Sequence, residues 1–203
     1  EDTYLVMSPR RGLIKRVALE AISSIRPSGL IIMNLKKGDE LAEARLAKEE
    51  EDVIMVSERG MSVRFPLGAI PPRQRAAGGV KGMMLRPKDR VVSMDIVGPT
   101  SRLLVISKLG YGKVTPIAKY RRQGRGGLGV KTFNITRKTG PVAAAQVVDD
   151  SSEVYVVSEQ AQVLRTSLSE ISSMGRLTQG VTIFKPQPGD KVSSIACVKD
   201  IIR

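Results

Sequence analysis

Tyr4 to Val17 reads YLVMSPRRGLIKRV, and the same pattern returns three times along the chain. The later copies are VIMVSERGMSVRF at Val53 to Phe65, LLVISKLGYGKVT at Leu103 to Thr115 and VYVVSEQAQVLRT at Val154 to Thr166. In each copy an apolar run rich in β-branched residues leads into a serine and a turn, and a second short run follows. This pattern is typical of two short antiparallel strands, so we expect an all-β protein.

Two further short motifs, which we also use as markers of the repeat, recur at nearly the same interval as the first. The dipeptides Gly29-Leu30, Gly79-Val80, Gly129-Val130 and Gly180-Val181 recur at intervals of 50, 50 and 51 residues, and each opens an apolar stretch. A turn into another strand follows at GDEL (38–41), KDRV (88–91), TGPV (139–142) and GDKV (189–192). Three markers in register predict a repeat protein. We expect one propeller-like domain over residues 1–203, with four-stranded antiparallel blades at about 1–49, 50–98, 99–149 and 150–203.

The composition excludes several classes of function. The chain has no histidine and a single cysteine, Cys197, which excludes catalytic triads that use histidine, disulfide frameworks and clustered-thiolate metal sites. We therefore expect no cofactor, no metal and no catalytic site of its own. No apolar run approaches the roughly 18 residues of a membrane span, and Glu1-Asp2-Thr3 does not resemble a signal peptide, so we expect a cytoplasmic protein.

The charge points to a polyanionic partner. The formal net charge is +13, and aromatic residues are only 3% of the chain, which favours duplex nucleic acid over single strands that stack on aromatic rings. Residues 101–150 hold ten basic and two acidic side chains. The acidic run at residues 49–52, at the join of the first two repeats, is interpreted as a solvated junction.

The centre of the basic third repeat is YRRQGRGGLGV, from Tyr120 to Val130. Glycines let the backbone approach a phosphate closely, and each guanidinium can bind two phosphate oxygens. The glycines also match the dinucleotide-binding pattern G-x-G-x-x-G, but that motif requires a following helix, and a strand is expected here. We interpret the segment as a phosphate clamp that binds a duplex with little sequence preference and a steep dependence on salt.

Loops at the same place in the other repeats also hold basic residues, namely Arg26 in the first repeat, Arg73 and Arg75 in the second and Arg176 in the fourth. If equivalent loops line up, a duplex that follows them must bend, at a cost of about 1 to 6 kcal/mol for 20 to 30 base pairs. The residues predicted to contact phosphates are Arg121, Arg122, Arg125 and Lys131 first, then Lys113, Lys119, Arg73, Arg75 and Lys81.

These repeats resemble a known family, the C-terminal domain of the gyrase A protein of bacterial DNA gyrase, a type IIA topoisomerase. The resemblance covers the whole chain. Its most specific motifs are GYGKVTPIAKY (110–120), GVKTFNIT (129–136) and VLRTSLSEISSMGRLTQGVTIFK (163–185). The family's DNA-wrapping box has the form Q-R-R-G-G-R-G and lies in its first blade. Residues 121–127 have the same composition in another order and in a later repeat.

The resemblance implies a β-pinwheel whose blades exchange strands and whose basic rim wraps double-stranded DNA to support negative supercoiling. It also implies that the catalytic tyrosine, the ATP site and the partners of this domain lie in the gyrase B protein or in the rest of the gyrase A protein. Two alternatives stay open. One is the equivalent domain of topoisomerase IV, and the other is a propeller-type scaffold that binds an acidic protein.

Overall fold

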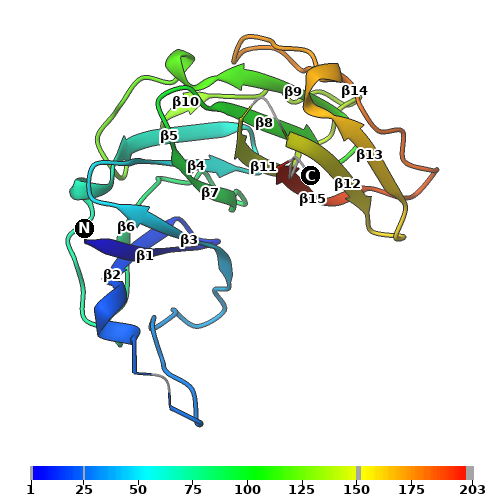
Figure 1. Ribbon diagram of the computed structural model, residues 1–203. Helices are drawn as coiled ribbons and strands as arrows, with labels where there is room; N and C mark the ends of the chain where they lie inside the picture. Colours follow the sequence, from blue (N-terminus) through cyan, green and yellow to red (C-terminus); the bar gives the residue numbers. More distant parts are fainter. Residues whose placement is uncertain (1, 25, 150–151, 200–203) are drawn as a thin grey trace. The chain divides into compact units, whose positions relative to one another are not determined.

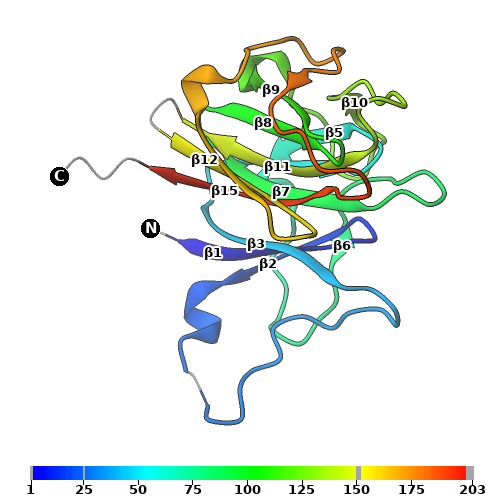
Figure 2. The ribbon, with the colours of Figure 1, turned by 90° about the vertical axis from the view of Figure 1, so that its right-hand side faces the viewer.

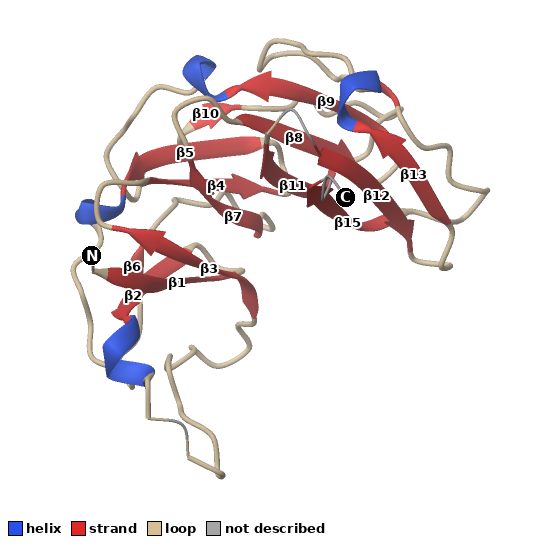
Figure 3. Cartoon of the chain, in the orientation of Figure 1, coloured by secondary structure: helices blue, strands red, loops and turns tan. Residues whose placement is uncertain are grey.

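The computed structural model describes residues 2–24, 26–149 and 152–199. Its regular structure consists of short strands and four short 3-10 turns, with no longer helix among the described residues (Figure 3). The turns are η1 (Leu19–Ile22), η2 (Leu67–Ala69), η3 (Ile117–Lys119) and η4 (Leu168–Glu170). No helical segment in this part is long and apolar enough to cross a membrane. The two ends of the expected domain, residue 1 and residues 200–203, lie outside the described residues.

Each repeat supplies three antiparallel strands to one sheet, with the first strand of the repeat next to the second (Figure 1). The first and third sequence markers therefore correspond to strands in every repeat, whereas Gly29-Leu30, the first copy of the second marker, opens no strand. The first repeat gives β1 (Thr3–Pro9), β2 (Leu13–Ala18) and β3 (Leu41–Lys48), and the second gives β4 (Asp52–Ser57), β5 (Met61–Pro66) and β7 (Val91–Val97). The third gives β8 (Arg102–Ser107), β9 (Tyr111–Pro116) and β11 (Val142–Val148), and the fourth gives β12 (Ser152–Ser158), β13 (Val163–Ser167) and β15 (Val192–Lys199).

A fourth, two-residue strand reaches each of the first three sheets from the following repeat. These exchanged strands are β6 (Val80–Lys81), β10 (Val130–Lys131) and β14 (Val181–Thr182), which lie beside β2, β5 and β9 respectively. The glycine–valine markers therefore open strands that leave their own repeat, as the resemblance implied. The expectation of four strands per sheet is wrong for the last sheet, which has the order β13-β12-β15, because β13 receives no exchanged strand within the described residues. Figure 2 shows β12 beside β15 in this sheet.

Contacts divide the chain into two compact units. Unit 1 comprises Glu1–Ser57, Ser62–Gly98 and Arg121–Val130, and unit 2 comprises Glu58–Met61, Pro99–Tyr120 and Lys131–Arg203. Each unit has its own buried side chains. Unit 1 buries Val6, Ile14, Val53, Met55 and Phe65 among others.

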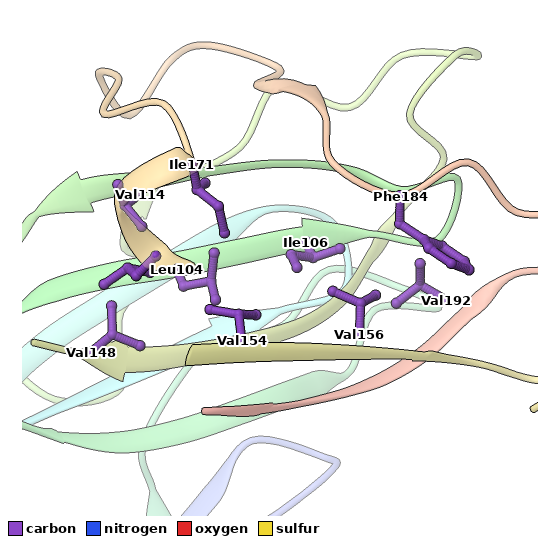
Figure 4. Close-up of a cluster of buried hydrophobic side chains, with 10 residues drawn as sticks. Leu104, Ile106, Val114, Val148, Val154, Val156, Ile171, Phe184 and Val192 are labelled. Carbon is purple, nitrogen blue, oxygen red and sulfur yellow. The ribbon is translucent and has the colours of Figure 1, made fainter. Parts of the chain in front are cut away.

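In unit 2 the buried aliphatic side chains come from two sheets and the segments that follow them (Figure 4). Leu104 and Ile106 on β8 face Val154 and Val156 on β12, and Phe184 closes one side. Such runs of adjacent buried residues explain why the strands lack the alternation of half-exposed strands. The burial of each of these side chains stabilises the fold by about 1.5 to 3 kcal/mol.

Candidate nucleic-acid interface

The glycine- and arginine-rich segment belongs to the third repeat in sequence but to unit 1 in space. We call Arg121–Val130 the arm. Its backbone forms a chain of hydrogen bonds with the second repeat. Gln123 N–H donates to Arg64 O at 2.7 Å, and Gly126 N–H donates to Gly82 O at 2.7 Å. The arm is thus a fixed part of unit 1 and not a loose loop.

Two glycines of the arm, Gly126 and Gly129, have a positive φ that favours glycine, and Gly129 is also tightly packed. Gly129 has a φ of 76°, and a Cβ there would overlap the carbonyl oxygen of Ser62. Gly124, in contrast, has no atom within 4 Å of where its Cβ would stand. Gly129 therefore permits close backbone packing, whereas Gly124 faces open space.

A buried carboxylate holds one arginine of the arm. Asp52, at the start of β4, is 3% exposed. Its Oδ1 accepts a hydrogen bond from Arg122 Nη2 at 2.6 Å, and its Oδ2 accepts from Arg122 Nε at 3.1 Å and from Arg64 Nε at 2.8 Å. Burial alone would raise the pKa of Asp52, but the hydrogen bonds from Arg122 and Arg64 outweigh it and lower that pKa. Asp52 is therefore ionised at neutral pH.

These contacts correct two expectations. The acidic run is not wholly a solvated junction, because Asp52, its last residue, is buried and paired with two arginines. The guanidinium of Arg122 is not wholly free to bind phosphate, because its Nε and Nη2 are bound to Asp52. The Arg122 side chain nevertheless stays 58% exposed. One edge of the guanidinium is fixed and the other is available to an anion.

Arg125 also differs from the expected phosphate contact. Its Nε donates to Ala69 O at 3.0 Å and its Nη1 donates to Lys81 O, so the half-buried side chain anchors the arm to unit 1. The same anchoring recurs in the next repeat. There Arg176 Nη1 donates to Lys131 O at 2.9 Å within unit 2. Each of these two arginines binds a backbone carbonyl of the strand exchanged one repeat earlier, and Arg125 also binds Ala69 O in η2.

The prediction that Lys113 contacts phosphate is wrong, because this side chain is fully buried. Its Nζ donates to the carbonyl oxygens of Gly175, Arg176 and Thr178 at 2.6, 2.9 and 3.0 Å. Burial, with a smaller contribution from the nearby Arg176 charge, lowers the pKa of Lys113 to about 8. The sequence shows only that a lysine follows the turn, which is compatible with an exposed or an enclosed ammonium.

Lys15 in unit 1 also donates hydrogen bonds to three backbone carbonyl oxygens. Its Nζ donates to the carbonyl oxygens of Ile32, Arg75 and Ala77 at 2.8, 2.7 and 2.7 Å. Both lysines lie three residues after the turn glycine, so alignment of the repeats could have paired them. Sequence reasoning missed Lys15, Arg64 and Asp52, since partners 12 to 70 residues apart cannot be assigned from local patterns.

The remaining predicted contacts are accessible to a ligand. In unit 1, Arg73, Lys81 and Arg121 are exposed and Arg75 is half-buried. In unit 2, Lys119 and Lys131 are exposed. The arm and Lys81 are brought together, since a Cβ on Gly126 would lie 3.6 Å from Lys81 Cδ. Lys81 thus lies beside the arm at Gly126, and Arg121 and Arg122 are the first two residues of the arm. We call these three exposed cations the arm cluster.

The described residues contain no group of three or more acidic or cysteine side chains that could hold a metal. The arm cluster offers instead what an anion with many oxygens needs, namely exposed cations on a backbone held in place by hydrogen bonds. This chemistry suits phosphates. It does not by itself select a sequence of bases.

Repeated antiparallel sheets completed by strands from the next repeat define the class as propeller-like repeat domains. The sequence matches the family described as DNA gyrase C-terminal domain, beta-propeller, over residues 4–48, 51–98, 101–149 and 152–199. The chain therefore belongs to this family.

Relatives support the same assignment. The chain is 39% identical over 202 residues to the DNA gyrase A protein of Dehalogenimonas lykanthroporepellens, and 40% identical over 195 residues to that of Mycolicibacterium smegmatis. These alignments cover 97% and 95% of the chain but only 25% and 23% of the relatives. The chain thus spans about a quarter of their length.

Solved structures agree in fold. A DNA gyrase A C-terminal domain matches 97% of the chain with a TM-score of 0.88 and 27% identity, and the match covers 66% of that domain. The C-terminal domain of a DNA topoisomerase IV matches 98% of the chain with a TM-score of 0.91, covering 62% of that structure. Its identity of 21% shows the shared fold alone.

Proposed function

We propose that this chain binds double-stranded DNA through its phosphates, with little sequence preference, and bends and wraps the duplex. The observation that carries the proposal is the arm cluster, where Lys81, Arg121 and Arg122 are exposed on a backbone that unit 1 holds in place. The family assignment supports the same function, because the relatives are gyrase A proteins of DNA gyrase.

The domain is proposed to be an accessory part of a gyrase that supports negative supercoiling. Its partners would be the gyrase B protein together with the rest of the gyrase A protein, in the cytoplasm, and the catalytic tyrosine and the ATPase would lie in those other parts. Lys119 and Lys131 in unit 2 are further candidate phosphate contacts, together with Arg73 and Arg75 in unit 1. A bent duplex costs about 1 to 6 kcal/mol, which several such contacts must offset.

The test of binding is an affinity measurement on three duplexes of unrelated sequence. Wild-type protein should bind all three with similar affinity, and Arg122→Ala should weaken binding about equally for each and lower the salt slope by roughly 1. A change of base preference with an unaltered slope would contradict the proposal. Wrapping is tested by ligating nicked plasmid with the protein bound. Wrapping predicts a shift in linking number after the protein is removed, and no shift would contradict it.

A second candidate is a scaffold that binds an acidic protein, favoured by the two acidic against ten basic residues within positions 101–150. Competition separates it from DNA binding. If the chain is a scaffold, polyglutamate should displace a labelled acidic protein and a duplex should show no micromolar affinity at low salt. If the chain binds DNA, duplex should compete far better than polyglutamate at equal charge.

A further inference from the structure

The buried Asp52 joins strands β4 and β5 to the arm. This carboxylate does not itself bind phosphate. Two of its bonds hold Arg122, which comes from the next repeat, and a third holds Arg64 on the neighbouring strand. Beside this contact the backbones of Arg64 and Arg122 form an isolated parallel bridge, and Gln123 N–H donates to Arg64 O. Asp52 is thus the point at which side chains tie the first part of the arm to the sheet.

Comparison with the third and fourth repeats shows that neither contains this arrangement. In the fourth repeat Glu153 and Arg165 occupy the same register as Asp52 and Arg64, since Asp52 faces Pro66 where Glu153 faces Ser167. Arg165 Nε donates to Glu153 Oε2 at 2.9 Å. In the third repeat the equivalent bridge joins Val114 and Ser173, with no carboxylate at position 102. Among the described residues, Asp52 is the cross-strand carboxylate that also captures an arginine of the arm.

The geometry of Arg122 follows from this capture. A carboxylate that binds both Nε and Nη2 fixes the plane of the guanidinium, and the opposite edge then points away from the carboxylate. The Asp52 side chain is 3% exposed and the Arg122 side chain 58% exposed, so the fixed edge faces the protein and the other edge faces solvent. A phosphate would meet a donor that is already oriented, with less side-chain entropy to lose on binding.

We propose that Asp52 is a positioning residue for DNA binding, which orients Arg122 and holds the start of the arm so that the arm cluster meets phosphates in one fixed arrangement. The inference rests on the proposed function. It runs against the simple electrostatic expectation, because an acidic residue beside a cationic cluster would by charge alone weaken the attraction to DNA. Removal of this one carboxylate should therefore reduce affinity although it raises the net charge.

The experiment compares Asp52→Asn with Glu153→Gln in the 203-residue chain. Each substitution removes one negative charge and breaks one cross-strand pair with an arginine, but only the first releases the arm. We expect Asp52→Asn to weaken duplex binding about tenfold and to make the slope of log K against log salt shallower by about 1. Glu153→Gln should leave the slope unchanged and the affinity equal or slightly higher. Asp52→Glu should restore part of the loss.

A second variant covers the case in which Asp52→Asn does not fold. Arg122→Lys keeps the charge on the exposed arm but cannot bind both carboxylate oxygens through a planar fork. The positioning role predicts that Arg122→Lys also weakens binding several-fold, whereas a bulk charge effect predicts no change. Equal effects of Asp52→Asn and Glu153→Gln, or wild-type binding by Arg122→Lys, would overturn the inference. Absence of duplex binding by the wild-type chain would instead overturn the proposed function.

Discussion

The ammonium of Lys113 lies 2.6 Å from the carbonyl oxygen of Gly175, 62 residues further along the chain. Lys113 is on β9 and Gly175 is in the loop that leads to the exchanged strand β14. One buried cation thus fastens the incoming loop of the fourth repeat to the sheet of the third. Lys15 fastens the loop of the second repeat to the first sheet in the same way.

The first prediction concerns the stability that this contact provides. Lys113→Met keeps most of the side-chain volume but leaves the three carbonyl oxygens that the ammonium binds without this donor, which should lower the free energy of unfolding by roughly 2 to 4 kcal/mol. Urea unfolding followed by circular dichroism measures the change. Lys119→Met, at an exposed position, is the control and should change little. Equal stability of the two variants would show that the carbonyl contacts contribute nothing.

The second prediction is a pH dependence. The pKa of Lys113 is about 8 in the folded chain against an ordinary 10.5, so between these values the unfolded chain binds more protons. The free energy of unfolding should then rise with pH across this window, by at most about 1.4 kcal/mol per pH unit from this group. The measurement is the stability of wild type minus that of Lys113→Met across this pH window. A difference that is flat or falls with pH would contradict the assignment.

The third prediction separates two glycines of the arm. Gly129→Ala places a Cβ against Ser62 O at a positive φ, and the backbone strain alone should cost about 1 to 3 kcal/mol. Gly124→Ala meets open space and should leave stability unchanged. Thermal unfolding of both variants tests this. If Gly124→Ala proved the more damaging change, the placement of the arm would be wrong.

The fourth prediction separates two arginines that the sequence treats alike. Arg121 is exposed, and Arg125 donates to Ala69 O and Lys81 O. Arg121→Ala should therefore make the salt slope of duplex binding shallower by about 1 without loss of stability. Arg125→Ala should lower stability as well as affinity. The melting temperature and the salt slope of each variant decide the matter, and a destabilised Arg121→Ala would contradict the assignment.

Local patterns predicted most of the strands. The apolar runs before each serine and the turns near residues 38, 88, 140 and 189 mark strands that the structure contains. They could not show that the strand opened by Gly79, Gly129 or Gly180 joins the preceding sheet, because strand pairing depends on contacts distant in sequence. The resemblance to a known family supplied that feature.

The candidate DNA-binding residues were predicted less completely than the strands, because the sequence does not show which cations have partners within the protein. A count of basic residues finds the arm but does not distinguish a cation that faces solvent from one with a buried partner. The exposed cations include Lys81, Arg121 and Lys131. In contrast, the ammonium of Lys113 donates to carbonyl oxygens. Arg122 and Arg64 both bind Asp52. The repeat does carry one signal for Lys113, since Lys15 occupies the same position after the turn.

The most direct test of phosphate binding is the salt dependence of the affinity of the protein for a linear duplex of arbitrary sequence. Each neutralised phosphate contributes about −0.9 to the slope of log K against log salt, so the arm cluster and the exposed lysines of unit 2 predict a slope steeper than about −3. We expect measurable binding at about 50 mM KCl that is largely lost by about 200 mM. A slope near zero, or no binding at the lower salt concentration, would contradict the account.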